Sequence, residues 1–240
     1  VQQRFGQFMY GFYPGELRWR VDATIWLAIV GAAPLFVPQM PRKAFYGLAF
    51  LVIYPIIAWC LLHGGVLGLS VVPTSRWGGL MLTLVIAYVG ITGALPLGIL
   101  LALGRRSNLP AIKVLCVTFI EFWRGVPLII VLFMSSVMLP LFLPEGMSLD
   151  KLLRALVMVI FFEAAYIAEV VRGGMQAIPK GQYEAAAAMG LGYWRMMGLV
   201  ILPQALKLVI PGIVNTFIAL FKDTSLVIII GLFDLLNSIK

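Results

Sequence analysis

Six long apolar stretches constrain this chain more than any other feature of its sequence. They cover residues 22–38, 44–62, 78–104, 114–141, 152–172 and 205–236. A helix needs about 20 apolar residues to cross the hydrocarbon core of a bilayer. With 62% hydrophobic and 12% charged residues, the chain is also far less charged than a soluble domain. The pattern predicts an all-α, polytopic transmembrane helical bundle, with a kink at Pro127 and a polar break near residues 222–225.

The basic residues predict how the bundle is oriented, because cytoplasmic loops are enriched in lysine and arginine. One set of loops holds nine of them and the opposite set holds six. The richer set is Arg42, Lys43, Arg105, Arg106, Lys113, Arg172, Lys180, Arg195 and Lys207, and the poorer set is Arg4, Arg18, Arg20, Arg76, Lys151 and Arg154. The bias places residues 176–203 in the cytoplasm and the aromatic, basic tail of residues 1–21 outside.

Several classes of chemistry do not fit the sequence. The net charge of +8 lies in short clusters between apolar runs, so nucleic acid is not an expected partner. A single histidine, His63, cannot form a histidine metal cluster, and Cys60 and Cys116 lie inside apolar runs, where they suggest neither a disulfide framework nor a metal site. No Walker-type phosphate loop is present, so we expect no cofactor in this chain and no ATP bound by that route. We also expect both ends of the chain to be truncated.

Ionisable residues inside the apolar stretches are the candidates for a substrate path, because each costs about 2.5–3.5 kcal/mol on insertion scales. Glu121 and Arg124 share a helix face, where they form either an ion pair beside Pro127 or part of the path. Glu163 lies roughly 13 Å from the cytoplasmic end of its helix. It is expected to bind either a substrate ammonium group or a neighbouring helix.

The polar break at Lys222, Asp223 and Thr224 supplies the remaining candidates. Broken helices present backbone and charge to the substrate in many transporters, whereas the alternative here is a salt bridge to another helix. Glu169 and Arg172 are expected to form a structural ion pair. An α-amino acid needs both an anion and a cation partner, and these stretches hold both signs.

A small-residue segment lies between the last two apolar stretches. Residues 183–189 are good helix formers with four consecutive alanines, Gly190 suits a left-handed helix stop, and residues 193–202 predict a second helix closed by Pro203. The segment is either a helical hairpin on the membrane surface or a docking element for another protein.

The spacing of Glu184, Ala185, Ala186, Gly190, Val200, Leu202 and Pro203 resembles the cytoplasmic EAA loop of ABC importer permeases, in which valine at 200 replaces isoleucine. Three further segments are similar to those of polar amino-acid permeases. They are Glu121 to Pro127 (EFWRGVP), Ala165 to Gly174 (AYIAEVVRGG) and Phe217 to Leu226 (FIALFKDTSL). The chain therefore resembles the permease subunits of general L-amino acid ABC importers.

This resemblance implies the MetI-like fold of type I ABC importer permeases and a multi-pass location in the bacterial inner membrane. Residues 1–77 would form an external segment and two additional spans. Residues 78–240 would form the core, with four of an expected five helices. The coupling residues would be Glu184, Ala185, Ala186, Gly190, Leu202 and Pro203, docking on an ATPase subunit that holds ATP and Mg. A second permease chain, expected to be a paralogue, an external amino-acid-binding protein and membrane lipid are the other expected partners.

Two other functions compete with this interpretation. A carrier driven by an ion gradient would contain inverted repeats, and none is evident in the sequence. A membrane enzyme would need a convergent catalytic set, and one histidine provides no such set. We therefore expect a transport subunit that is not itself an enzyme.

Overall fold

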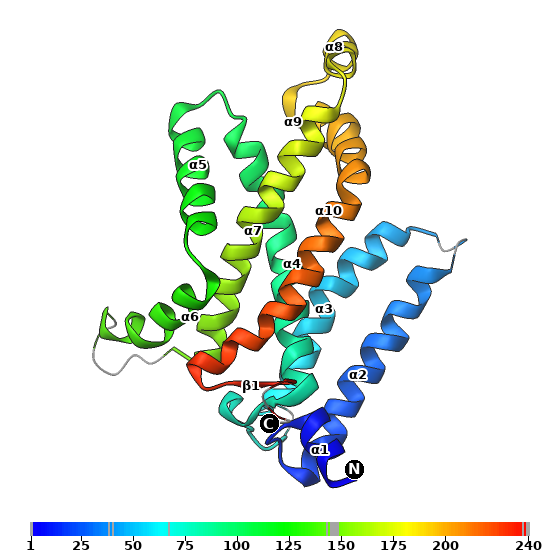
Figure 1. The fold of residues 1–240 in the computed structure, drawn as a ribbon. Helices are drawn as coiled ribbons and strands as arrows, with labels where there is room; N and C mark the ends of the chain where they lie inside the picture. The colour runs from blue at the N-terminus through cyan, green and yellow to red at the C-terminus, as the bar shows by residue number, and fades with distance from the viewer. Residues whose placement is uncertain are drawn as a thin grey trace. The chain divides into compact units, whose positions relative to one another are not determined.

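The computed structural model describes residues 2–37, 39, 41–66, 68–142, 144, 149–236 and 238 (Figure 1). The chain divides into two compact units. The first comprises Val1–Val89, Ser136–Ala155 and Thr224–Lys240, and the second comprises Gly90–Ser135 and Leu156–Asp223. Each unit has its own buried residues and is considered by itself below.

The first unit contains the two helices expected ahead of the core. Helix α1 (Gln2–Tyr10) precedes α2 (Arg18–Ala32), which continues as a 3₁₀ helix over Ala33–Phe36, and α3 (Lys43–His63) packs against α2. The predicted stretches 22–38 and 44–62 therefore correspond to α2 and α3, although residue 38 lies outside the described residues. Both helices expose many apolar side chains, as expected for helices that face lipid.

Polar contacts fasten the N-terminal segment to the loop after α3. The buried Arg20 guanidinium donates a hydrogen bond of 2.8 Å to the backbone carbonyl of Ser70. The Tyr13 hydroxyl, also buried, donates one of 2.8 Å to the carbonyl of Leu62. Tyr13 and Arg20 thus hold their part of the aromatic, basic tail against the end of α3 and the loop that follows it.

The second unit is a helical bundle built on small residues. It contains parts of α4 (Gly79–Arg105) and α7 (Lys151–Ala177), together with α5 (Pro110–Gly125), most of α6 (Leu128–Val137), α8 (Lys180–Ala188), α9 (Tyr193–Met196) and α10 (Leu202–Asp223). Its core includes fully buried residues of α4, α5, α7 and α10, namely Ala94, Ala102, Ile120, Ala164, Ile167, Ala168 and Ala205.

Glycines let the helices of this bundle approach closely. A Cβ atom on Gly98 of α4 would lie 2.9 Å from the Ala164 carbonyl oxygen of α7, and one on Gly174 of α7 would lie 2.8 Å from that of Ala205 in α10. Small residues at helix interfaces are typical of membrane bundles, where van der Waals packing drives association. The structure confirms the predicted all-α membrane bundle.

The number of spans differs from the six predicted. Among the described residues, four segments are long and apolar enough to cross a membrane: Gly15–Phe36, Phe45–His63, Gly79–Arg105 and Tyr193–Ile230. Helices α5 and α6 would count as a fifth if they form one span, but they meet at a bend of 99°. The expected kink at Pro127 is therefore a sharp break, since proline cannot continue the hydrogen-bond ladder of α5.

Helix α7 accounts for the remaining difference. It has 27 residues, as α4 does, but it also carries Arg154, Glu163, Glu169 and Arg172 and is therefore less apolar. Its middle part is packed in the bundle, with Ala164, Ile167 and Ala168 fully buried. A helix enclosed by other helices needs less apolar surface than one that faces lipid.

The polar break after α10 is confirmed in a different form from the one predicted. Helix α10 ends at Asp223 and the backbone tightens into a 3₁₀ helix over Thr224–Ile230. The backbone therefore remains helical through the polar residues. After this segment, the two-residue strand β1 (Phe233–Asp234) forms isolated parallel bridges with Gly78 and Gly79.

Candidate functional site

Helix α8 holds the residues expected to dock on a partner. Within the second unit, α8 and α9 lie beyond the ends of α7 and α10 (Figure 1). Glu184 and Ala185 are exposed, whereas Ala186 retains only 4% exposure because it faces the bundle. The predicted helix of residues 183–189 is therefore present, with an exposed side formed by small residues.

Gly190 ends α8 as the sequence predicts. Its φ angle is +74°, and its N–H donates to the Ala187 carbonyl at 2.9 Å while that of Leu191 donates to the Ala186 carbonyl at 3.2 Å. These two bonds form a Schellman-type stop, which satisfies carbonyls that the helix itself leaves free. Glycine adopts the left-handed conformation at almost no steric cost, which explains this residue at this position.

The prediction that a second helix closes at Pro203 is wrong. Helix α9 leads into a π-helical turn over Met197–Ile201, and α10 then begins at Leu202 and continues through Pro203. The proline ring lacks an N–H and clashes with the carbonyl four residues earlier in a regular α-helix. The wide π turn just before it relieves that conflict, so α9 and α10 are one continuous helical path.

Tyr183 anchors α8 to the rest of the unit. Its hydroxyl donates a hydrogen bond of 2.9 Å to the carbonyl of Met175 in α7 and accepts one of 2.9 Å from Arg106 Nη1. The Arg106 guanidinium also lies over the Tyr183 ring, 5.3 Å from its centroid. Sequence reasoning missed this anchor because the two residues are 77 positions apart.

Large apolar side chains are exposed just after the end of α8, on α9 and in the π turn. Met189 is 81% exposed, and Trp194 and Leu199 are each 71% exposed. Isolated exposed apolar residues are ordinary, and these three follow one another closely in the chain after the exposed alanines of α8.

Glu169 is the centre of a charge cluster at the same end of the unit, where α4 ends. Its carboxylate lies 2.6 Å from Arg105 Nη1 and 2.7 Å from Arg172 Nη2, and Arg124 Nη1 is 3.9 Å away. The expected pair of Glu169 and Arg172 is therefore confirmed. Residues from α4, α5 and α7 meet in this cluster, which ties the three helices together.

The expected ion pair between Glu121 and Arg124 does not form. Glu121 instead binds Arg105 at 3.0 Å, while Arg124 turns toward Glu169 and also lies over the Tyr166 ring, 5.6 Å from its centroid. Glu121 and Arg124 thus each lie near a charged residue of another helix and do not pair with each other. Sequence spacing alone could not predict a pairing between different helices.

The residues of the expected substrate path are only partly brought together. Glu163 retains 3% exposure, and Asp223 at the end of α10 lies close enough to interact with it electrostatically. Lys222 is exposed, and Thr224 is buried in the first unit. The structure therefore places two carboxylates together in the second unit, whereas the sequence suggested a lysine and a carboxylate.

Metal coordination finds no support in the described residues. No group of three or more His, Cys, Asp or Glu side chains there is arranged to hold a metal ion. Asp223 acts on Glu163 electrostatically, and the carboxylates of Glu121 and Glu169 bind arginines.

Comparison with known proteins gives consistent matches. A family model described as "Binding-protein-dependent transport system inner membrane component" matches residues 94–240. The inner membrane amino-acid ABC transporter permease protein YhdY of Escherichia coli K12 is 65% identical over 240 residues, which are 100% of this chain and 65% of that protein. The glutamate/glutamine/aspartate/asparagine transport system permease protein BztC of Rhodobacter capsulatus is 41% identical, with 100% of this chain and 68% of that protein covered. The chain therefore spans about two thirds of the length of these relatives.

Solved structures agree with the sequence matches. The crystal structure of an amino acid ABC transporter with histidines superposes with a TM-score of 0.58 at 34% identity, covering 65% of this chain and 72% of that one. An inward-facing structure of the MetNI methionine ABC transporter superposes with a TM-score of 0.50 at 25% identity, covering 64% and 71%. The expected fold of a type I ABC importer permease is confirmed.

Proposed function

Because this chain belongs to the family of binding-protein-dependent transport system inner membrane components, we propose that it is the transmembrane subunit of an ATP-driven importer of L-amino acids. The observation that carries the proposal is α8, an exposed small-residue helix with the expected Glu184, Ala185 and Gly190 at its surface. The names of the relatives support an amino acid as the substrate. The chain itself is a transport component and not an enzyme.

In this proposal α8 docks on an ATPase subunit and transmits its movement to the bundle. Tyr183 links α8 directly to α7 and to Arg106 after α4. The π turn and Pro203 join α9 to α10 without a break. A displacement of α8 therefore acts on three helices at once. ATP shifts the bundle between inward-open and outward-open states only if the ATPase contacts differ between those states.

Glu163 and Asp223 are the best candidates to receive the ammonium group of the substrate. Two nearby carboxylates repel each other, and a cation between them would relieve the repulsion. Because burying charge in a membrane is costly, ionisable groups that are kept there usually have a function. Glu121 and Arg124 are weaker candidates, because Arg105 and Glu169 already engage them.

The proposed assembly has several further parts. An ABC ATPase would hold ATP and Mg, a second permease chain would complete the pathway, and an external binding protein would deliver the substrate. Residues 1–77 would add a segment and two spans to the core of residues 78–240, with residues 176–203 as the coupling loop facing the cytoplasm. The whole would be a multi-pass protein of the bacterial inner membrane.

Reconstitution with the ATPase and the binding protein tests the proposal. In proteoliposomes, Gly190→Glu and Glu184→Lys should lower ATP-dependent uptake of labelled amino acids while leaving insertion and expression unchanged. Gly190→Asn and Glu184→Gln are the matched controls, because asparagine tolerates a positive φ and glutamine keeps the shape of glutamate. Unimpaired uptake by the first two variants would contradict the docking role of α8.

The same vesicles identify the class of transporter. A competition panel of unlabelled amino acids should reduce the uptake of the labelled one, and withdrawal of ATP should abolish it. Uptake that persists without ATP under an ion gradient would favour a gradient-driven carrier and refute the proposed energy source.

A further inference from the structure

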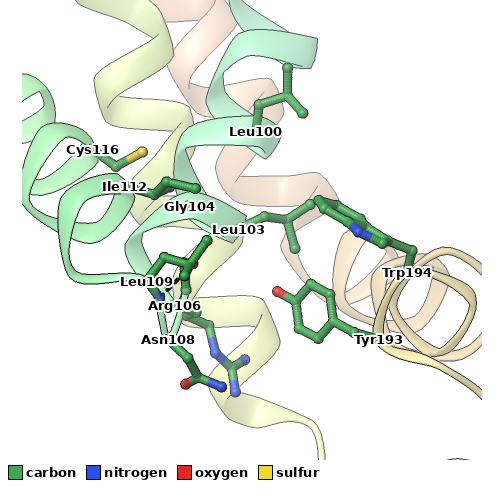
Figure 2. A pocket seen from close by; sticks show the side chains of 11 residues that line it. Leu100, Leu103, Gly104, Arg106, Asn108, Leu109, Ile112, Cys116, Tyr193 and Trp194 are labelled. Atoms are coloured by element: carbon green, nitrogen blue, oxygen red, sulfur yellow. Dashed lines mark hydrogen bonds between the residues drawn. The ribbon is translucent and has the colours of Figure 1, made fainter.

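A cavity of about 410 Å³ opens in the second unit between the end of α4, the start of α5 and α9 (Figure 2). This volume lies in the range of ligand pockets, which is about 300–1,000 Å³. The cavity is separate from Glu163 and Asp223 and from the exposed alanine side of α8, so the proposed function leaves it unexplained.

One part of the cavity is polar and carries positive charge. Arg106, Ser107 and Asn108, from the turn after α4, line it, and no acidic side chain is among its lining residues. Arg106 is exposed and uses Nη1 to hold Tyr183. A guanidinium has five N–H donors, and no hydrogen bond within the described residues uses its Nε or Nη2. The polar part can therefore accept an anion without disturbing the Tyr183 anchor.

The other part of the cavity is apolar and open to the exterior of the bundle. Leu103, Ile112 and Cys116 form its wall, and the rings of Tyr193 and Trp194 stand on its opposite side (Figure 2). Trp194 is 71% exposed and Tyr193 is 42% exposed. Tyrosine and tryptophan are enriched where a membrane protein passes through the lipid headgroups. A cationic end joined to an apolar wall beside such rings matches an amphipathic anion.

We propose that this cavity binds one anionic phospholipid of the leaflet on the α8 side. The phosphate would lie against Arg106, Ser107 and Asn108, and an acyl chain would run along Leu103 and Ile112. Basic pockets between transmembrane helices on the cytoplasmic side are a known form of site for anionic headgroups. The inference rests on the proposed membrane orientation. A lipid bound to Arg106 would also affect the position of α8, because the same Arg106 holds Tyr183.

Protection of Cys116 from alkylation tests the proposal. Cys60→Ala removes the other cysteine of these 240 residues. The full transporter complex is placed in nanodiscs of phosphatidylcholine with or without phosphatidylglycerol. The rate at which a membrane-impermeant maleimide labels Cys116 should fall when phosphatidylglycerol is present. Arg106→Gln should weaken that protection roughly fivefold, the size expected for one basic residue at an anionic membrane surface. Arg195→Gln, an exposed basic residue of α9 outside the cavity, is the matched control and should keep full protection.

Each other result would overturn the proposal for a stated reason. Equal labelling in both lipids would exclude selective binding of the anionic lipid. Protection by inorganic phosphate in pure phosphatidylcholine would indicate a soluble anion. Protection that disappears when the complex is prepared without its ATPase subunit would indicate a protein partner. Phospholipid counted by mass spectrometry in the purified complexes supplies an independent measure if Arg106→Gln also alters α8. Since none of these measurements uses ATP-driven uptake, failure here is distinct from failure of the proposed function. In sealed vesicles of known orientation, labelling of Cys116 only from the side opposite the ATPase subunits would instead refute the orientation.

Discussion

Replacing Gly190 by alanine should loosen the end of α8, whereas the same change at Gly192 should have no effect. The two glycines are two residues apart and both are exposed, and a Cβ atom on either would meet nothing within 4 Å. They differ in backbone conformation, because φ is +74° at Gly190 and −65° at Gly192. The pair therefore separates backbone strain from every effect of added volume.

The size of the effect follows from this conformation. A left-handed backbone costs an L-residue about 1–2 kcal/mol. Taking the lower figure, Gly190→Ala should favour opening of the helix end by about fivefold, since 1.4 kcal/mol corresponds to a factor of ten. The two bonds that close α8, from the N–H groups of Gly190 and Leu191, would be the ones to open.

Hydrogen exchange of the intact complex measures this opening directly. Peptides that span residues 186–191 should exchange about fivefold faster in Gly190→Ala and at the native rate in Gly192→Ala. Gly190→Asn should fall between them, because asparagine tolerates the left-handed region better than alanine does. Equal exchange in Gly190→Ala and Gly192→Ala would refute the reasoning, and faster exchange in both would show that volume matters and not φ.

Three further outcomes are expected. Glu169→Gln should destabilise the second unit by about 2–3 kcal/mol, because it weakens two close arginine contacts. Glu121→Gln should cost under about 1 kcal/mol, because the Glu121 side chain is 55% exposed. Thermal unfolding of the detergent-purified complex distinguishes the two variants. Glu163→Gln should lower amino-acid uptake roughly tenfold or more without loss of folded protein, as one charge-assisted contact is worth about 1.5–3 kcal/mol, and native uptake would remove Glu163 from the path. Ala186→Leu should overpack the contact between α8 and the bundle, lower the free energy of unfolding by about 1–3 kcal/mol and reduce ATPase binding. The exposed Ala187→Leu should fold normally. Equal stability of the two variants would contradict the burial of Ala186.

Features governed by local sequence could be predicted well. Every apolar stretch yields helix, although the stretch of residues 114–141 is divided between α5 and α6, and the glycine at position 190 ends α8 with the expected geometry. The pair of Glu169 and Arg172 also forms, since its spacing of three residues is a property of one helix. In each case the controlling contacts lie within a few residues.

Features governed by contacts between helices could not be predicted. Arg105 binds Glu121 and Glu169 from a different helix, and this choice of partner replaces the expected pair of Glu121 and Arg124. The anchor formed by Tyr183 depends likewise on Arg106, a residue far away in the chain. These partners are set by how the helices pack, which no spacing rule along one helix contains.

Pro203 illustrates a third kind of error. Proline usually ends or kinks a helix, so the end of the helix was the natural expectation. The wide turn over Met197–Ile201 instead absorbs the missing hydrogen bond, and the helix continues. Five residues of π-helix have no strong sequence pattern by which they could be recognised in advance.

That wide turn also determines where this helical path can lose a residue. A π turn accommodates one residue more than the regular helix around it, and each residue of an α-helix advances by about 100°. Because the turn absorbs the extra residue, removing one residue from Met197–Ile201 would restore a regular helix and leave α8 and α9 facing nearly the same way around α10. Removing one residue from the regular part of α10 would instead turn Glu184 and its alanines by about 100° around that axis. A single deletion therefore redirects the segment or leaves it in place according to whether it falls in α10 or in the π turn.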